Sequence, residues 1–180
     1  MNSRQKNKTF TVLFRLVLYA MLGALLFVSK EVFAFLPNIH PLGMFMLAFT
    51  AVYRWGALVP IYIFVLLCGI YNGFGTWWVS YLYVWAILWG VGMLIPKKIY
   101  TSRMGYFVLP IVNGLYGLSF GALCAPWEAL VRGFDFKQTM VWISAGLSFD
   151  IYHLLGNFAA GLLVVPLVLL LTKLERIYVK

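Results

Sequence analysis

The stretch LSFDIYHLLGNF, residues 147–158, places three polar side chains inside the last long apolar run of the chain. Asp150, His153 and Asn157 follow one another at spacings of three and four residues. At about 100° per residue on a helix, all three fall within an arc of about 60° and share one face. An ionisable group at membrane depth costs about 2.5 kcal/mol or more, so this face is expected to meet a cavity, a partner helix or a substrate.

The composition around this stretch indicates a polytopic helical membrane protein. Of the 180 residues, 63% are hydrophobic and only 11% are charged, whereas soluble domains carry about 25% charged residues. The first apolar run continues past the length of a signal peptide and has no small-residue cleavage site. Cys68 and Cys124 both lie in apolar segments and are interpreted as small hydrophobic residues, not as a disulfide or metal pair.

Hydropathy along the chain predicts six transmembrane spans in a single domain covering residues 1–180. The last run is too long for one perpendicular crossing at 1.5 Å per residue, so its first turns are expected to lie either in a loop-like segment or in an outer region, with Pro166 kinking the remainder. The segment CAPWEALVRGFDFKQT, residues 124–139, is predicted to be a long connection. The predicted spans are Val12–Val28, Leu42–Tyr53, Ala57–Tyr71, Thr76–Ile95, Tyr106–Leu123 and Thr139–Leu174.

The 14 lysines and arginines are distributed unequally between the two sides of such a bundle. Three lie on one side, namely Lys30, Arg132 and Lys137. The side that carries both termini has the other eleven: Arg4, Lys6, Lys8, Arg15, Arg54, Lys97, Lys98, Arg103, Lys173, Arg176 and Lys180. By the positive-inside rule both termini are cytoplasmic, and residues 1–11 form a basic cytoplasmic segment. The basic excess is therefore a topology signal, and no nucleic-acid partner is predicted.

Small residues in two of the runs predict close helix packing. In the first run Ala20 and Ala24 are four residues apart with Gly23 beside them, which gives a flat strip for a partner in the bilayer. In the last run Gly146, Gly156 and Gly161 are expected to admit another backbone.

Aromatic and amide side chains supply candidates for a ligand site on the outer side. Tyr81 and Trp85 share a helix face and Trp78 lies close to it, so they are interpreted either as a stacking wall for a flat ligand or as membrane-interface anchors. Directional hydrogen bonds to a ligand are expected from Asn38, His40, Asn72, Asn113 and Tyr116. The polar triad Asp150, His153 and Asn157 either joins this site or braces the bundle. No metal-ligand cluster and no nucleophile motif is found in the sequence, so neither a metal site nor an enzyme is predicted.

Together these features resemble a transporter family. Six short spans, the Ala20–Ala24 strip and the pattern Gly146, Phe149, Asp150, His153, Gly156, Asn157 are similar to the substrate-binding S component of an energy-coupling factor (ECF) vitamin transporter. The PNIHP segment, residues 37–41, and the last-helix pattern look most like the cobalamin subfamily. The resemblance covers the whole chain and implies a compact six-helix S-component-like bundle in a prokaryotic plasma membrane.

The resemblance also implies partners and roles. A vitamin ligand is captured outside, and no intrinsic cofactor is expected. Uptake is powered by a transmembrane coupling protein and two cytoplasmic ATPases. Ala20, Gly23 and Ala24 would meet the coupling protein, residues 29–43 would form an outer lid loop, and Phe149–Asn157 would line or brace the pocket. The alternative from another class is a proton-coupled secondary transporter that uses Asp150 and His153.

Overall fold

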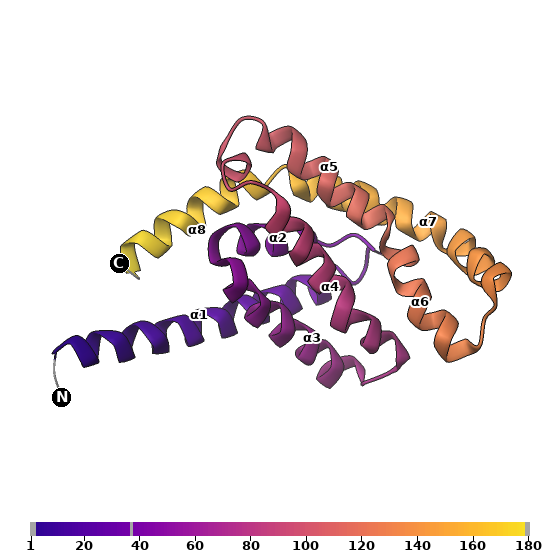
Figure 1. The fold of residues 1–180 in the computed structure, drawn as a ribbon, viewed down its shortest axis with the longest axis horizontal. Coiled ribbons are helices and arrows are strands. Elements are labelled where there is room, and N and C mark those ends of the chain that lie inside the picture. The colour runs from indigo at the N-terminus through magenta and orange to yellow at the C-terminus, as the bar shows by residue number, and fades with distance from the viewer. Residues whose placement is uncertain (1–2, 37, 179–180) are drawn as a thin grey trace.

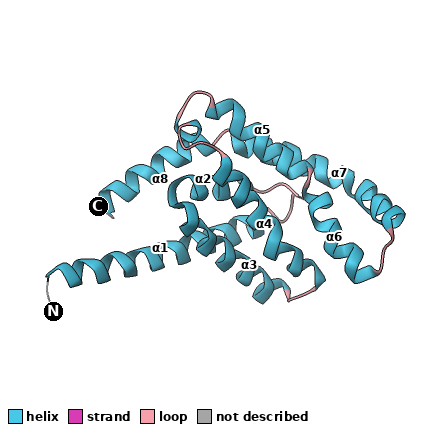
Figure 2. Ribbon diagram, in the orientation of Figure 1, coloured by secondary structure: helices cyan, strands magenta, loops and turns pink. Residues whose placement is uncertain are grey.

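A computed structural model of the chain describes residues 3–36 and 38–178, and this part is all-helical, without strands (Figures 1 and 2). The predicted all-α class is confirmed at this level. Residues 1–2 of the predicted basic N-terminus, Pro37 of the predicted lid loop and residues 179–180 lie outside the described residues, as do the side chains of Arg4, Lys6 and Lys8. The helices are α1 (Ser3–Val32), α2 (Leu42–Tyr53), α3 (Leu58–Asn72), α4 (Thr76–Leu94), α5 (Gly105–Leu118), α6 (Phe120–Arg132), α7 (Phe136–Gly161) and α8 (Val164–Tyr178).

Four helical stretches are long and apolar enough to cross a membrane. They are Thr9–Val32, Leu42–Asn72, Thr76–Leu94 and Gly105–Arg132, and the bent pair α7–α8 makes a fifth if it counts as one span. The number of candidate spans is smaller than the predicted six because α2 and α3 count together as one stretch. The bounds of α2 agree with the prediction, but the helix is short. Its 12 residues extend about 18 Å, which is short of the hydrocarbon thickness of about 30 Å.

Helix α2 lies at the centre of the molecule (Figure 1). Its side chains Met46, Leu47, Ala48 and Phe49 are buried, and α2 contacts α4, α7 and α8. A helix that is apolar on all sides is stable only when neighbours cover all of them. The 3-10 turn Arg54–Ala57 then redirects the chain into α3, with Arg54 in a left-handed conformation at φ 54°.

The α1–α3 pair forms one packed unit (Figure 1). Gly23 is buried, and a Cβ there would lie 2.5 Å from Cγ2 of Ile63 and 3.0 Å from the carbonyl oxygen of Pro60. The helices are therefore at the minimum separation that a glycine allows. The N-terminal part of α1 extends away from the other helices, and the free ends of α1 and α8 point to the same side of the molecule (Figure 1).

The α5–α7 pair is the second packed unit, and α6 continues it. A Cβ at Gly117 would lie 2.6 Å from the carbonyl oxygen of His153, and one at Gly161 would lie 2.5 Å from Cα of Pro110. The expected close approach at Gly161 and at Gly156, which faces Ile39, is confirmed, whereas Gly146 faces open space. Gly117 of α5 and Gly121 of α6 are four residues apart in the sequence and both contact α7, which is a small-residue signal that sequence reasoning missed.

The predicted long connection over residues 124–139 is wrong. Helix α6 continues to Arg132 and α7 begins at Phe136, so the prediction of a loop-like start to the last run is also wrong. Gly133 ends α6 in the left-handed conformation at φ 66°, as C-terminal glycines commonly do. Asp135 and Gln138 start α7 with a reciprocal capping box. Because Gly133 ends α6 and Asp135 caps α7, three residues are enough to connect the two helices.

The predicted kink near Pro166 is confirmed as a bend of 49° between α7 and α8. The break is at Leu162 and Leu163. Proline has no N–H to donate to the carbonyl four residues earlier, and its ring clashes with that carbonyl. For Pro166 that residue is Leu162, which explains why the bend precedes the proline.

Candidate functional site

The polar face of α7 points into the protein, as predicted from its spacing. Asp150, His153 and Asn157 are 5%, 4% and 4% exposed, while their neighbours Phe149, Ile151 and Tyr152 are exposed. The three side chains nevertheless meet different partners, and only one of them lines a cavity.

Asp150 joins α7 to the start of α6. Its Oδ1 accepts a hydrogen bond from the backbone N–H of Gly121 at 3.0 Å, and a Cβ at Gly121 would collide with this carboxyl group. Gly121 lies in the first turn of α6, where backbone N–H groups have no partner within the helix and the helix dipole favours a negative charge. Asp150 therefore braces the α6–α7 hairpin.

Asn157 and Asn113 connect α7, α5 and the start of α2. The amide Nδ2 of Asn113 donates to the backbone oxygen of Asn157 at 2.7 Å, so Asn113 has the partner that its depth was expected to require. Both side-chain Oδ1 atoms are buried without a hydrogen-bond partner among the described residues. A Cβ at Gly43 would collide with both amides, so only a glycine admits the first turn of α2 here.

A cavity of about 240 Å³ lies between the end of α1, the connection to α2, and helices α4, α6 and α7. It brings together four of the predicted ligand residues, Asn38, His40, Tyr81 and His153. Four of the others, Lys30, Phe33, Ala34 and Leu36, belong to the segment 29–43 that was predicted as a lid, whereas Phe120 was missed, because one apolar residue in an apolar run gives no signal. The full lining is Lys30, Phe33, Ala34, Leu36, Asn38, His40, Tyr81, Phe120 and His153.

Two histidines meet at the floor of this cavity. The Nε2 atoms of His40 and His153 are 3.3 Å apart, and the ring centroids are 5.2 Å apart at 64°. Phe120 packs edge-on against His153 with centroids 4.8 Å apart. Burial, together with a smaller effect of the charge of Lys30, lowers the pKa of His40 to about 4. His40 is therefore neutral at neutral pH. Lys30 itself pairs with Glu31, Nζ to Oε1 at 2.8 Å.

An aromatic wall stands beside the histidines. The predicted common face of Tyr81 and Trp85 is confirmed by ring centroids 5.4 Å apart, and Phe120 packs against Trp85 at the same distance. The indole Nε1 of Trp85 is buried without a partner in the described part of the chain. Tyr116 stands behind Trp85 and donates its hydroxyl to the backbone oxygen of Val84 at 2.7 Å.

Seven of the eleven predicted ligand residues do not line the cavity, and two of these, Trp78 and Asn72, lie at the corner formed by α1, α3 and α4. Trp78 donates its indole N–H to the backbone oxygen of Val65 at 2.8 Å and packs against Phe74. Asn72 is exposed and donates from Nδ2 to Oε1 of Glu31 at 3.3 Å. Both contacts join neighbouring elements of the α1–α3–α4 corner.

The predicted partner strip on α1 is divided by the fold. Ala20 and Ala24 are exposed, whereas Gly23 is buried against α3. Large apolar neighbours such as Val17 and Met21 are also exposed. The outer face of α1 is thus apolar and free of contacts with the rest of the described chain at Ala20 and Ala24.

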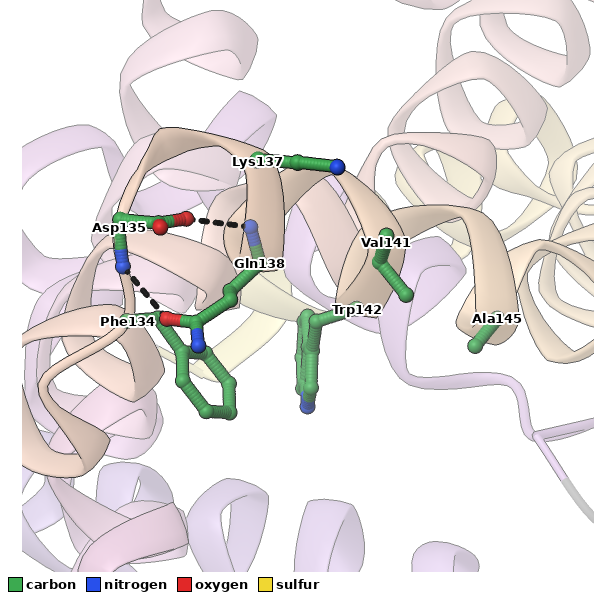
Figure 3. A pocket seen from close by; sticks show the side chains of 7 residues that line it. All are labelled: Phe134, Asp135, Lys137, Gln138, Val141, Trp142 and Ala145. Atoms are coloured by element: carbon green, nitrogen blue, oxygen red, sulfur yellow. Dashed lines mark hydrogen bonds between the residues drawn. The ribbon is translucent and has the colours of Figure 1, made fainter.

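A second, more open hollow of about 630 Å³ lies along the first turns of α7 (Figure 3). Phe134 and Trp142 point to the same side of the helix (Figure 3). The polar groups beside them serve the capping box, in which Gln138 N–H donates to Asp135 Oδ1 at 2.7 Å and Asp135 N–H donates to Gln138 Oε1 at 2.9 Å. The hollow therefore offers a ligand mainly apolar surface.

No family model, curated protein or solved structure matches this chain significantly.

Proposed function

We propose that this chain is the substrate-binding S component of an ECF-type importer, which captures a vitamin-like ring outside the cell and delivers it with a coupling protein and two ATPases. The observation that carries the proposal is the cavity under residues 30–40, with an aromatic wall and two histidines at its floor. Capture sites are concave and mostly apolar, with a few polar groups that orient the ligand.

The volume of the cavity favours a small flat ligand. At about 240 Å³ it is below the range of about 300–1,000 Å³ typical of sites for drug-sized ligands. A pyridine or pterin fits this space better than cobalamin, which would require residues 30–40 to move away from α7. Tyr81 and Phe120 line the cavity and offer ring faces and edges, and the amide of Asn38 offers hydrogen bonds to substituents.

The exposed face of α1 supports the second half of the proposal. In lipid, close van der Waals packing drives helix association, and small residues permit it. Ala20 and Ala24 are exposed together on this face. The free ends of α1 and α8 point to the same side of the molecule (Figure 1), which is consistent with an energising module that docks there from the cytoplasm.

The first test is native mass spectrometry of the gently purified chain, followed by uptake assays with the coupling protein and ATPases. A co-purified ring compound and uptake that requires ATP hydrolysis are expected. Uptake by the lone chain in proteoliposomes, driven by a proton gradient, would contradict the proposal and favour the secondary transporter. Asp150 is already engaged by Gly121 N–H, so nothing in the site favours that alternative.

The variant Ala24→Trp separates docking from capture. It is expected to reduce uptake to background and leave ligand binding unchanged, because a large ring prevents close approach at a small-residue face. Leu25→Trp is the matched control, since Leu25 is also exposed and lies about 100° further round the helix. Equal loss of uptake in both variants, or loss of binding in Ala24→Trp, contradicts the docking assignment.

A further inference from the structure

The chain contains two histidines in all, and the fold brings their Nε2 atoms to 3.3 Å although they are 113 residues apart. We propose that His40 and His153 bind one transition-metal ion, such as Zn²⁺, which ties the connection before α2 to α7. This site does not depend on the proposed transport function. Imidazole nitrogen is a preferred ligand of zinc, copper and nickel.

The distance between the two nitrogens matches a metal chelate. Two nitrogens that each lie about 2.0–2.1 Å from a tetrahedral metal are about 3.3–3.4 Å apart. A direct N–H···N hydrogen bond between the two rings also reaches 3.3 Å when one ring is protonated at Nε2, so the metal competes with that tautomer for the pair. The distance between the ring centroids also agrees with a shared metal. A tetrahedral metal that lies in the plane of both rings would hold the two centroids about 5.2 Å apart, and the observed separation is 5.2 Å.

The outer nitrogens leave both rings free to act as ligands. A metal-bound neutral histidine presents the lone pair of one nitrogen and carries its proton on the other. Here His40 Nδ1 and His153 Nδ1 are both buried, and no described residue bonds to either. The described residues therefore do not fix the tautomer of either ring, and they do not provide the hydrogen-bond acceptor that metal-bound histidines usually have at this second nitrogen.

The surroundings limit the protein ligands to two. Among residues 3–36 and 38–178, no group of three or more His, Cys, Asp or Glu side chains is arranged to hold a metal. The remaining coordination positions face the cavity, whose lining includes the amide of Asn38 and the ring of Tyr81. Such a site keeps positions for water or for an oxygen or nitrogen donor of a small ligand, as sites with an open position do.

The experiment uses the full chain, purified in detergent with an affinity tag that contains no histidine and then stripped with a chelator. Cobalt(II) is titrated first and followed by its visible absorption. Zn²⁺ is titrated separately and followed by its competition with bound cobalt(II). One ion per chain is expected, with X-ray absorption showing two imidazole nitrogens. Hydrogen exchange of residues 33–41 is expected to slow when the ion binds, because the ion fixes that connection to α7.

His40→Gln is the decisive variant, because His40 lies in a connection and not within a helix. It is expected to weaken binding at least about 100-fold, which is the upper end of the effect of losing only an outer-shell partner. Cys68→Ala with Cys124→Ala is the control, because these thiols are the other soft donors of the chain. It is expected to bind the ion as the native chain does.

Three results would overturn the metal site. They are no bound ion in the native chain, unchanged affinity in His40→Gln, and loss of binding in the cysteine variant. Because the X-ray absorption measurement is made on the native chain, a misfolded variant does not leave the proposal untested.

Discussion

The α1–α3 and α5–α7 pairs both rely on a glycine at their contact, but the chemistry around that glycine differs. Gly23 of α1 faces the side chain of Ile63 and, at a slightly greater distance, the carbonyl oxygen of Pro60, with no polar side chain among its nearest contacts. Gly117 of α5 faces the backbone of His153 and the amide of Asn157, within a set of buried hydrogen bonds from α7. The comparison teaches that apolar helices of similar hydropathy are held either by shape alone or by shape together with polar contacts that fix register.

Gly117→Leu is expected to have the largest effect on this comparison. The obstacle at Gly117 is backbone, with the carbonyl oxygen of His153 at 2.6 Å, so no side-chain rotation makes room. The free energy of unfolding is expected to decrease by about 3 kcal/mol or more, at the upper end of the range for overpacking a core. A thiol-reactive dye that reports exposure of buried Cys68 during heating measures it.

Gly146→Leu is the matched control for that substitution. It lies on the same α5–α7 unit, but nothing lies within 4 Å of a Cβ there, so its melting temperature is expected to stay close to that of the native chain. An equal decrease in both variants would show that leucine is harmful anywhere on this unit and that the close contact at Gly117 is not the reason.

Asp150→Ala is expected to have the next largest effect. It leaves the N–H of Gly121 without its acceptor in a buried place, which costs about 1–3 kcal/mol. Asp150→Asn keeps an acceptor oxygen and is expected to recover most of that stability. The same thermal assay distinguishes them, and equal stability of Asp150→Ala and the native chain would show that the carboxylate does not brace α6.

Gly23→Ala is expected to have the smallest effect of the three, about 1 kcal/mol, at the lower end of the overpacking range. The added Cβ meets the side chain of Ile63 at 2.5 Å, and a side chain moves more easily than a backbone. Gly23→Ala is expected to cost less stability in an Ile63→Ala background than in the native chain, because Ile63→Ala removes Cγ2, the nearest contact atom. A loss of stability in Gly23→Ala as large as that in Gly117→Leu would show that the α1–α3 contact is no more tolerant of added volume than the α5–α7 contact.

Several elements were predictable from local sequence alone. The bounds of α2 agree with the predicted Leu42–Tyr53, and those of α4 agree within one residue with Thr76–Ile95. In each case polar or glycine-rich segments interrupt an apolar run. The connection at 124–139 was predicted wrongly because its charged residues, such as Glu128 and Arg132, were interpreted as loop. They pair with each other at i and i+4 along α6, Nε to Oε2 at 2.7 Å.

The candidate site divides in the same way. The inward face of Asp150, His153 and Asn157 followed from helical periodicity, which depends only on neighbours in the chain. Which of them lines the cavity did not follow, because that depends on the approach of α5, α6 and residues 30–40. Trp78 is an example of what spacing does not predict. Its spacing placed it near the helix face of Tyr81 and Trp85, but its indole N–H donates to the backbone of α3.

The sequence by itself determined that this protein is helical, strongly apolar and suited to a bilayer, because composition and periodicity act residue by residue along the chain. Only the tertiary structure decided that His40 meets His153, that Asp150 holds the start of α6, and that Gly23 is covered while Ala20 and Ala24 stay exposed. The physical reason is that these contacts join residues remote in sequence. Their distances depend on how closely whole helices pack, and no local pattern records that separation.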